Sequence, residues 1–204
     1  MKNRQAILML FLANTISGVS QGICMIAIPW YFITILDWQS SFGIFYGSLT
    51  IISTFWSIYA GTLVDKYDRK RIQIIYSVTG CLLMGFAAVS GKLFPSSLWI
   101  TSGIVFGFTV LLYNVHYINI YSFAQEITPS KYYSKVISYI EIQGQATTIL
   151  GGALAAILMD GTSNGKLTIF GFQFGSEFYF DNWELYEIFG LDAVTYLLAV
   201  IVLS

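Results

Sequence analysis

The sequence predicts an all-α membrane protein with six transmembrane helices. Hydrophobic residues make up 56% of the 204-residue chain and charged residues only 10%, and the mean hydropathy of +0.68 is far from that of an ordinary soluble domain. Six separate apolar stretches are each long enough to cross the hydrocarbon core as a helix, which takes about 20 residues. Basic side chains gather in the loops on one side of these stretches, as they do in multi-pass membrane proteins.

The first apolar stretch runs from Ala6 to Leu36. The charged start before it imitates a signal peptide, but the apolar run is too long for a cleavable signal and no small-x-small cleavage site follows. Pro29 interrupts the stretch only near its outer end, and no other stretch contains an interior proline. We therefore expect six helices that are continuous over most of the bilayer depth, with the other five at Phe42–Val64, Ile72–Leu93, Leu98–Ala124, Tyr133–Met159 and Tyr186–Ser204.

The distribution of basic residues predicts the orientation of these helices. Eight of the ten Lys and Arg residues fall on the side of the amino terminus, and only Lys92 and Lys166 fall on the other. Because basic loops stay in the cytoplasm, both termini are expected to be cytoplasmic, in a plasma (inner) membrane. Aromatic residues typical of the membrane interface agree with an outer position for the opposite loops, namely Trp38, Trp99 and Trp183.

The long outer loop, residues 160–187, differs from the other connections. It is polar and aromatic, and Lys166–Phe170 and Phe172–Phe174 suggest two short strands around Gly171. A small external β-hairpin is therefore expected here. The loop can act as a lid over the helix ends or as a segment that catches substrate.

A charged motif lies between the second and third stretches and reads Gly61-Thr62-Leu63-Val64-Asp65-Lys66-Tyr67-Asp68-Arg69-Lys70-Arg71. Its spacing and its position between these two helices resemble the cytoplasmic loop signature of the major facilitator superfamily. Asp68 stands where that signature has its second glycine. This departure, together with Gly190-Leu191-Asp192-Ala193 in the last stretch, resembles the drug- and macrolide-efflux branch.

The resemblance implies half of a major facilitator fold, in which two sets of three helices form an inverted repeat. It covers the amino-terminal six helices of a family that normally has twelve. A second six-helix half is therefore an expected partner, supplied by the same polypeptide, a second copy or a separate subunit. The last stretch ends at the chain terminus, and we expect the chain to be part of a longer protein.

The motif has a physical reading of its own. Gly61 permits a close helix approach, and Asp65 can accept hydrogen bonds from the N-terminus of a partner helix. The basic residues Lys66, Arg69, Lys70 and Arg71 can pair with acidic groups or lipid phosphates. The resemblance implies a latch between two halves of a transporter, and the alternative is a plain determinant of topology.

Three ionisable residues are expected inside the membrane, where such groups are costly: His116, Glu141 and Asp192. His116 and Glu141 each lie about eight residues from the cytoplasmic helix end, roughly 12 Å deep, and can meet as a proton-accepting pair. The alternative is an interhelical hydrogen bond with a structural role. Asp192 fits either a helix-start carboxylate or a residue of the transport route.

Further polar residues form stripes on three of the predicted helices. On the fifth stretch Glu141 and Gln145 are followed by Thr148 at helical spacing, and the resemblance implies that the first, fourth and fifth helices border the substrate route. The remaining cavity candidates are Asn14, Gln21, Tyr113, Tyr117 and Asn119. The arginine that proton-exchanging members of the family often carry in the fourth helix is absent, as is their proline-bearing motif in the fifth.

The composition and motifs also exclude several functions. A net charge of −1 provides no basic face for nucleic acid. No enzyme motif, metal-ligand set or phosphate loop occurs, so neither an enzyme nor a cofactor is expected, and Cys24 and Cys81 are read as small buried apolar residues.

The expected function is export of an amphipathic small molecule by secondary active transport. The alternatives are a membrane scaffold or sensor derived from a half-transporter, and an uptake permease of the same fold.

Overall fold

The computed structural model describes residues 4–161, 166–169, 172–175 and 181–204. Lys2 of the predicted amino-terminal charge and Gly165 and Gly171 of the outer loop lie outside the described residues. Six long helices are present, and all are long and apolar enough to cross a membrane, which confirms the predicted fold class. They are α1 (Arg4–Trp30), α2 (Gln39–Lys66), α3 (Arg69–Leu93), α4 (Leu98–Ile127), α5 (Tyr133–Asp160) and α6 (Leu185–Leu203).

Short elements join or extend these helices. α1 ends at Trp30 and continues directly into a π-helical turn at Tyr31–Ile35. This change follows Pro29, which has no N–H to donate to the helix. Single 3-10 turns lead into α4 at Pro95–Ser97 and into α5 at Ser130–Tyr132.

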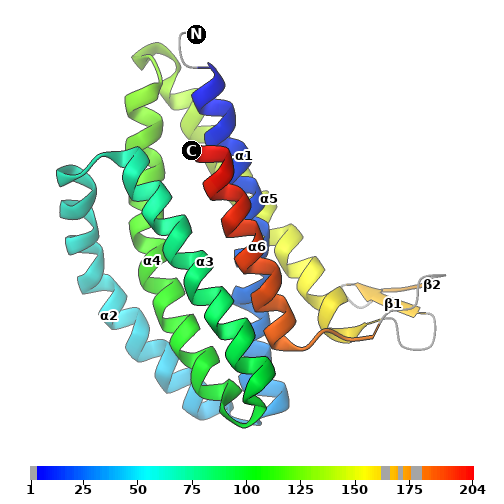
Figure 1. Ribbon diagram of the computed structural model, residues 1–204. Coiled ribbons are helices and arrows are strands. Elements are labelled where there is room, and N and C mark those ends of the chain that lie inside the picture. Colours follow the sequence, from blue (N-terminus) through cyan, green and yellow to red (C-terminus); the bar gives the residue numbers. More distant parts are fainter. Residues whose placement is uncertain (1–3, 162–165, 170–171, 176–180) are drawn as a thin grey trace.

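The connection between α5 and α6 contains two antiparallel strands. β1 (Lys166–Ile169) pairs with β2 (Phe172–Gly175), so that Lys166 lies opposite Gly175. These strands coincide with the segments in which the sequence suggests a hairpin, and they lie at the end of α5 remote from both termini (Figure 1).

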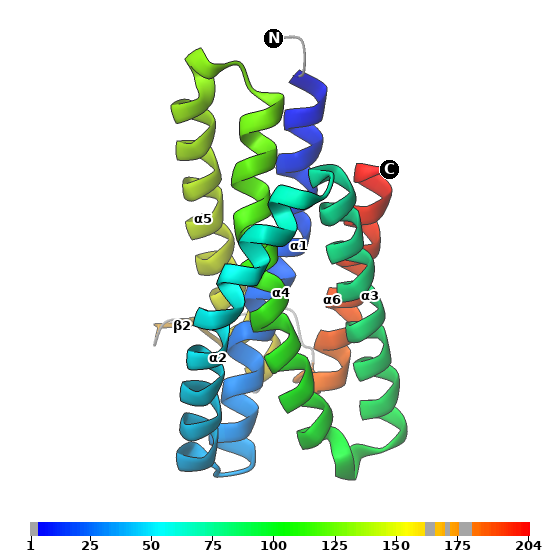
Figure 2. The ribbon, with the colours of Figure 1, turned by 90° about the vertical axis from the view of Figure 1, so that its left-hand side faces the viewer.

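The packing of the helices has an internal symmetry (Figures 1 and 2). α1 packs against α5 and α6, α4 packs against α2 and α3, and α3 packs against α6. Exchanging the first three helices for the last three leaves this set of contacts unchanged. Because α1 and α4 start at opposite ends of the bundle, the two triplets are inverted relative to each other, as in the repeats of secondary transporters.

Both termini lie at one end of the bundle, together with the α2–α3 and α4–α5 connections (Figure 1). The predicted cytoplasmic loops therefore share one end, and the α1–α2 and α3–α4 connections share the other. The Trp38 and Trp99 rings meet at this second end, with their centroids 5.2 Å apart.

Glycines permit the closest helix contact. A Cβ built on Gly151 of α5 would lie 2.8 Å from the Gly22 backbone of α1, whereas a Cβ on Gly144 of the same helix would meet nothing within 4 Å. Without a hydrophobic driving force between helices in lipid, such backbone proximity and the van der Waals contact it permits are a main source of cohesion. Gly61 was expected to play this role for α2, but the described chain offers no atom within 4 Å of a Cβ there.

We predict that Gly151→Ala separates α1 from α5 and destabilises the protein by about 1–3 kcal/mol, the usual cost of overpacking. Thermal unfolding in detergent should show a midpoint lowered by several degrees. Gly144→Ala is the matched control on the same helix and should leave the midpoint unchanged. Equal midpoints for the two variants would contradict the close contact.

Candidate functional site

A polar cavity of about 590 Å³ lies among α1, α2, α4 and α5. Seven of the nine residues predicted for a cavity line it, and they come from three helices: Asn14, Gln21, Tyr113, His116, Tyr117, Glu141 and Gln145. The structure thus brings together side chains that are up to 131 positions apart in the sequence (Asn14 to Gln145).

One wall of the cavity was missed by the sequence reasoning. Tyr46, Thr50 and Ser53 of α2 also line it. Their spacing of four and three residues is that of one helix face, so the signal was present in the sequence. It was obscured because hydroxyl groups are common in this helix and several of them, such as Thr50, bond to carbonyls of their own helix.

Glu141 contributes a carboxylate to the cavity lining. Its Oε1 accepts a hydrogen bond from the Tyr121 hydroxyl of α4, and the Tyr121 ring packs against that of Tyr117 at 4.8 Å between centroids. The Glu141 side chain is exposed to the cavity rather than buried between helices, so a molecule in the cavity can reach it.

His116 and Glu141 do not pair, which corrects the expectation that they meet. His116 Nε2 lies 2.9 Å from Asn14 Oδ1 and its Nδ1 lies 3.2 Å from Gln73 Nε2. Equal depth was inferred from the distance of each residue to its helix end, but depth does not specify the direction in which a side chain leaves the helix.

Asn119 is also not a cavity residue. It is fully buried, and its Nδ2 donates to the Arg69 carbonyl oxygen at 3.1 Å and to Gln73 Oε1 at 3.2 Å. Both acceptors belong to α3, so Asn119 connects α4 to the start of α3 behind the cavity.

Asp192 lies in the core and not at a helix start. It is fully buried two turns into α6, beside Cys24 of α1 and Thr195. The helix start is instead capped by Glu184 and Glu187, which form a capping box. Asp192 is not part of the cavity lining. The sequence did not reveal the true helix start, because the capping residues Glu184 and Glu187 lie within the polar loop.

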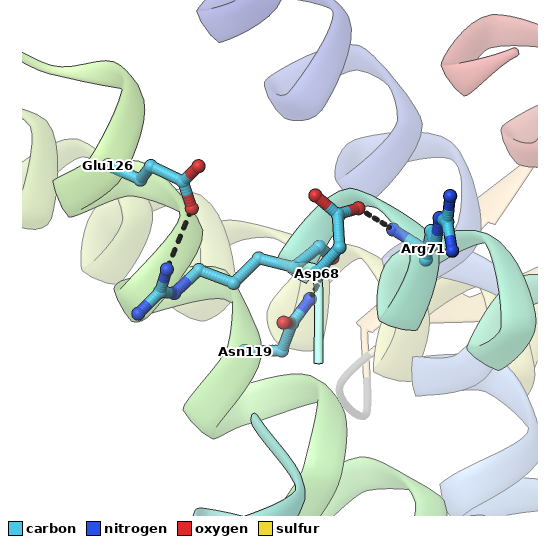
Figure 3. A network of polar contacts seen from close by, with 5 residues as sticks. Asp68, Arg71, Asn119 and Glu126 are labelled. Atoms are coloured by element: carbon cyan, nitrogen blue, oxygen red, sulfur yellow. Dashed lines mark hydrogen bonds and ion pairs between the residues drawn. The ribbon is translucent and has the colours of Figure 1, made fainter. Parts of the chain in front are cut away.

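The charged motif is held by three local contacts at the end of the bundle that carries both termini (Figure 3). Asp68 caps α3, because its carboxylate accepts the Arg71 backbone N–H at 2.8 Å. Arg69 Nη1 pairs with Glu126 Oε2 of α4 at 2.9 Å. Asn119 holds the Arg69 carbonyl from the same helix as Glu126.

These contacts account for the aspartate in place of the second glycine. An aspartate before the first helical turn satisfies a backbone N–H that would otherwise have no partner. Glu126 was not singled out from the sequence, although an acidic residue ending the fourth stretch on the basic side was a usable signal. Asp65, Lys66, Lys70 and Arg71 are exposed at this end of the bundle.

A second hollow, of about 550 Å³, lies between the first halves of α2 and α4, at the end of the bundle remote from the termini, and differs in character. Its lining is almost wholly aliphatic and aromatic, with Phe42, Phe45, Trp38 and Trp99 among the residues. Ser41 and the two tryptophans are its few polar lining residues, so it offers fewer hydrogen-bonding groups for specific binding than the first cavity. In the part of the chain that the structure describes, no group of three or more His, Cys, Asp or Glu residues could hold a metal ion.

Comparison with family models gives a match over most of the chain. The family model described as Major Facilitator Superfamily matches residues 1–152 of the chain. Neither a curated protein nor a solved structure gives a significant match.

We predict that Asp68→Ala lowers the stability of the protein by about 1 kcal/mol, the usual cost of removing an N-cap. Asp68→Ser, which retains a capping oxygen, should recover most of the loss. Thermal unfolding of the three proteins in detergent tests this, and equal losses for alanine and serine would show that the charge rather than the cap matters.

Proposed function

Because this chain belongs to the major facilitator superfamily, we propose that it is a secondary active transporter, or the amino-terminal half of one, that exports an amphipathic small molecule by alternating access. The observation that carries the proposal is the cavity among α1, α2, α4 and α5, in which aromatic rings and polar side chains alternate.

The cavity lining suits an amphipathic substrate. Tyr46, Tyr113, Tyr117 and Tyr121 offer ring faces, which supply apolar contact area and attract cations. Amide side chains such as Asn14 and Gln145 can bond to polar groups of the substrate. A pocket with an apolar surface and a few convergent polar groups is the usual form of a small-molecule site.

Glu141 is proposed as the residue that recognises a cation or takes part in ion coupling. Its carboxylate is the acidic group of the cavity lining, and intramembrane carboxylates commonly mark substrate or ion pathways. Tyr121 holds one carboxylate oxygen, which leaves the other free to bind a charged ligand.

Alternating access requires a second wall, which we propose to be another six-helix half. Among the six membrane spans, those of α2 and α5 are the least buried, at 11% and 22% of their residues, whereas the others reach 33–44%. These two helices flank the cavity, so a second half that covers them would close it. The second half can belong to the same polypeptide, to a second copy or to a separate subunit.

The exposed motif residues fit a latch against that second half. Gly61 has open space around it, and Asp65, Lys66, Lys70 and Arg71 are exposed at the same end. A partner helix can therefore approach Gly61 and place its N-terminus near Asp65. With eight basic residues on this side, we propose that it faces the cytoplasm and that the protein resides in the plasma membrane.

We predict that cells expressing the open reading frame that contains this chain accumulate less ethidium, an aromatic cation, than cells without it. Glu141→Gln should remove most of this difference, because the cation loses its carboxylate. Asp160→Asn removes a charge from the same helix outside the cavity and should not change accumulation. Fluorescence of the cells measures the effect.

The other outcomes separate the rival functions. Higher accumulation in expressing cells would indicate uptake rather than export. Unchanged accumulation for ethidium and for a panel of neutral and anionic amphipathic dyes would favour a scaffold or sensor that does not transport. Full activity of Glu141→Gln at every pH would exclude Glu141 from recognition and coupling.

A further inference from the structure

A continuous chain of hydrogen bonds runs through His116 and joins four helices. It begins at the Phe11 carbonyl of α1 and ends at the Arg69 carbonyl of α3. Between these backbone groups lie five side chains from α1, α3, α4 and α5, namely Gln143, Asn14, His116, Gln73 and Asn119. The chain therefore reaches from the cavity wall to the cytoplasmic start of α3.

The Phe11 end determines the direction of the bonds on one side of His116. A backbone carbonyl can only accept, so the Gln143 group 2.6 Å from Phe11 O must be the amide nitrogen. Gln143 Oε1 then accepts from Asn14 Nδ2 at 3.2 Å. Asn14 therefore presents its oxygen to His116, and Nε2 of the ring must carry a proton and donate.

The Arg69 end determines the other side in the same way. Asn119 must direct its Nδ2 at the Arg69 carbonyl, and the same nitrogen donates to Gln73 Oε1. Gln73 therefore presents its Nε2 to His116, 3.2 Å from Nδ1. Nδ1 must accept this bond, so it carries no proton. Two carbonyls thus select the neutral Nε2–H tautomer of His116 from opposite ends of the network.

We propose that His116 is a proton-controlled tie between the cavity and the cytoplasmic end of α3. A proton that reaches Nδ1 from the cavity forms an N–H bond with the ring lone pair and converts the neutral imidazole to imidazolium. Nδ1 then faces Gln73 Nε2 as donor against donor, and the bond between them is lost. The proposal rests on the proposed function only in taking the cavity as the transport route.

This contact between two donors is relieved by rearranging the side-chain amides of Gln73 and Asn119, which lie between His116 and Arg69. If Gln73 turns its oxygen to the imidazolium, its nitrogen faces Asn119 Nδ2, again donor against donor. If Asn119 turns in response, its Oδ1 accepts from Gln73, but the Arg69 carbonyl loses its donor. Asn119 Oδ1 is a buried atom without a hydrogen-bond partner in the present arrangement, so the turned arrangement gives it one. Protonation of the cavity residue thus releases the start of α3.

The release acts beside the ion pair of the charged motif. Arg69 is the first residue of α3, and its side chain pairs with Glu126 while its carbonyl is held by Asn119. Both contacts tie α3 to α4. With Asn119 released, only the half-exposed ion pair remains between Arg69 and α4, and such pairs contribute about 1 kcal/mol or less.

The groups around the ring indicate that the response to protonation originates at His116 itself. From α1 it meets Asn14, and from α3 it meets Gln73 and the Tyr76 ring, which stacks on it at 4.5 Å. Tyr113 of its own helix lies at 6.4 Å. The acidic groups of the neighbouring helices are Glu141 of α5, which accepts from Tyr121, and Asp192 of α6, which lies beside Cys24 and Thr195. Neither is hydrogen-bonded to His116.

The tautomer can be measured directly, because His116 is the one histidine among these 204 residues and a spectrum of His116→Gln identifies its signals in the full protein. In protein labelled with ¹⁵N-histidine, without a histidine tag and in lipid nanodiscs, the ring nitrogen shifts at alkaline pH should show Nε2 protonated and Nδ1 unprotonated. An Nδ1–H tautomer, or an equal mixture of the two, would overturn the proposal. This measurement needs no transport, so it stands or fails separately from the proposed function.

The coupling to α3 can be measured by hydrogen exchange of the peptide that contains Arg69 to Gln73. Acidification that protonates His116 should lower its protection, corrected for the intrinsic pH dependence, by roughly fivefold, the effect of losing one interhelical bond. Asn119→Ala should show the lowered protection already at alkaline pH and no further response. His116→Gln should remove the response to pH.

Asn114→Ala is the matched control for this experiment. Asn114 lines the cavity on the same helix, but its side chain bonds to the Val110 carbonyl of its own helix and is no part of the network. The variant should therefore respond to pH as the wild type does. A response that persists in Asn119→Ala, or that is absent from the wild type while His116 titrates, would overturn the proposal.

Discussion

The structure depends on one constraint, which is that a polar group inside the bilayer is costly unless it finds a partner in the protein or faces a cavity. This chain places a histidine and several amide side chains at that depth, and the helices are arranged so that these groups meet. Asn14, Gln73 and Gln143 come from three different helices, and each forms a hydrogen bond with another helix. The same network therefore selects the positions of α1, α3, α4 and α5 around the cavity.

The apolar packing supports this arrangement without being able to select it. Lipid tails are as apolar as the helix surfaces, so burial of apolar area provides little drive for helix association. Close backbone contact at Gly22 and Gly151 brings α1 and α5 together, and this places Asn14 within reach of Gln143. On the other side of the bundle, a Cβ at Gly80 would lie 2.8 Å from the Tyr196 ring. The Tyr196 hydroxyl is hydrogen-bonded to the hydroxyl of Tyr76, whose ring stacks on His116.

The cavity and the charged motif are connected through α3 and α4. His116 and Asn119 lie three residues apart on α4 and therefore on the same side of the helix. His116 also lines the cavity, whereas Asn119 reaches the Arg69 carbonyl at the start of α3. Gln73 bonds to both. Gln73 and Asn119 thus join the histidine of the cavity lining to the first residue of α3 through consecutive hydrogen bonds.

The number and approximate limits of the helices could be predicted from the sequence, because they follow from the length of the apolar runs and from the polar loops between them. It also identified seven cavity residues from their polarity and helical spacing. Only the tertiary structure decided that His116 bonds to Asn14 and Gln73 rather than to Glu141, that Asn119 faces α3, and that Asp192 is enclosed in the core. The physical reason is that a membrane helix hydrogen-bonds its own backbone at any rotation about its axis. The direction of each polar side chain is therefore decided by its partners on other helices, and those lie far away in the sequence.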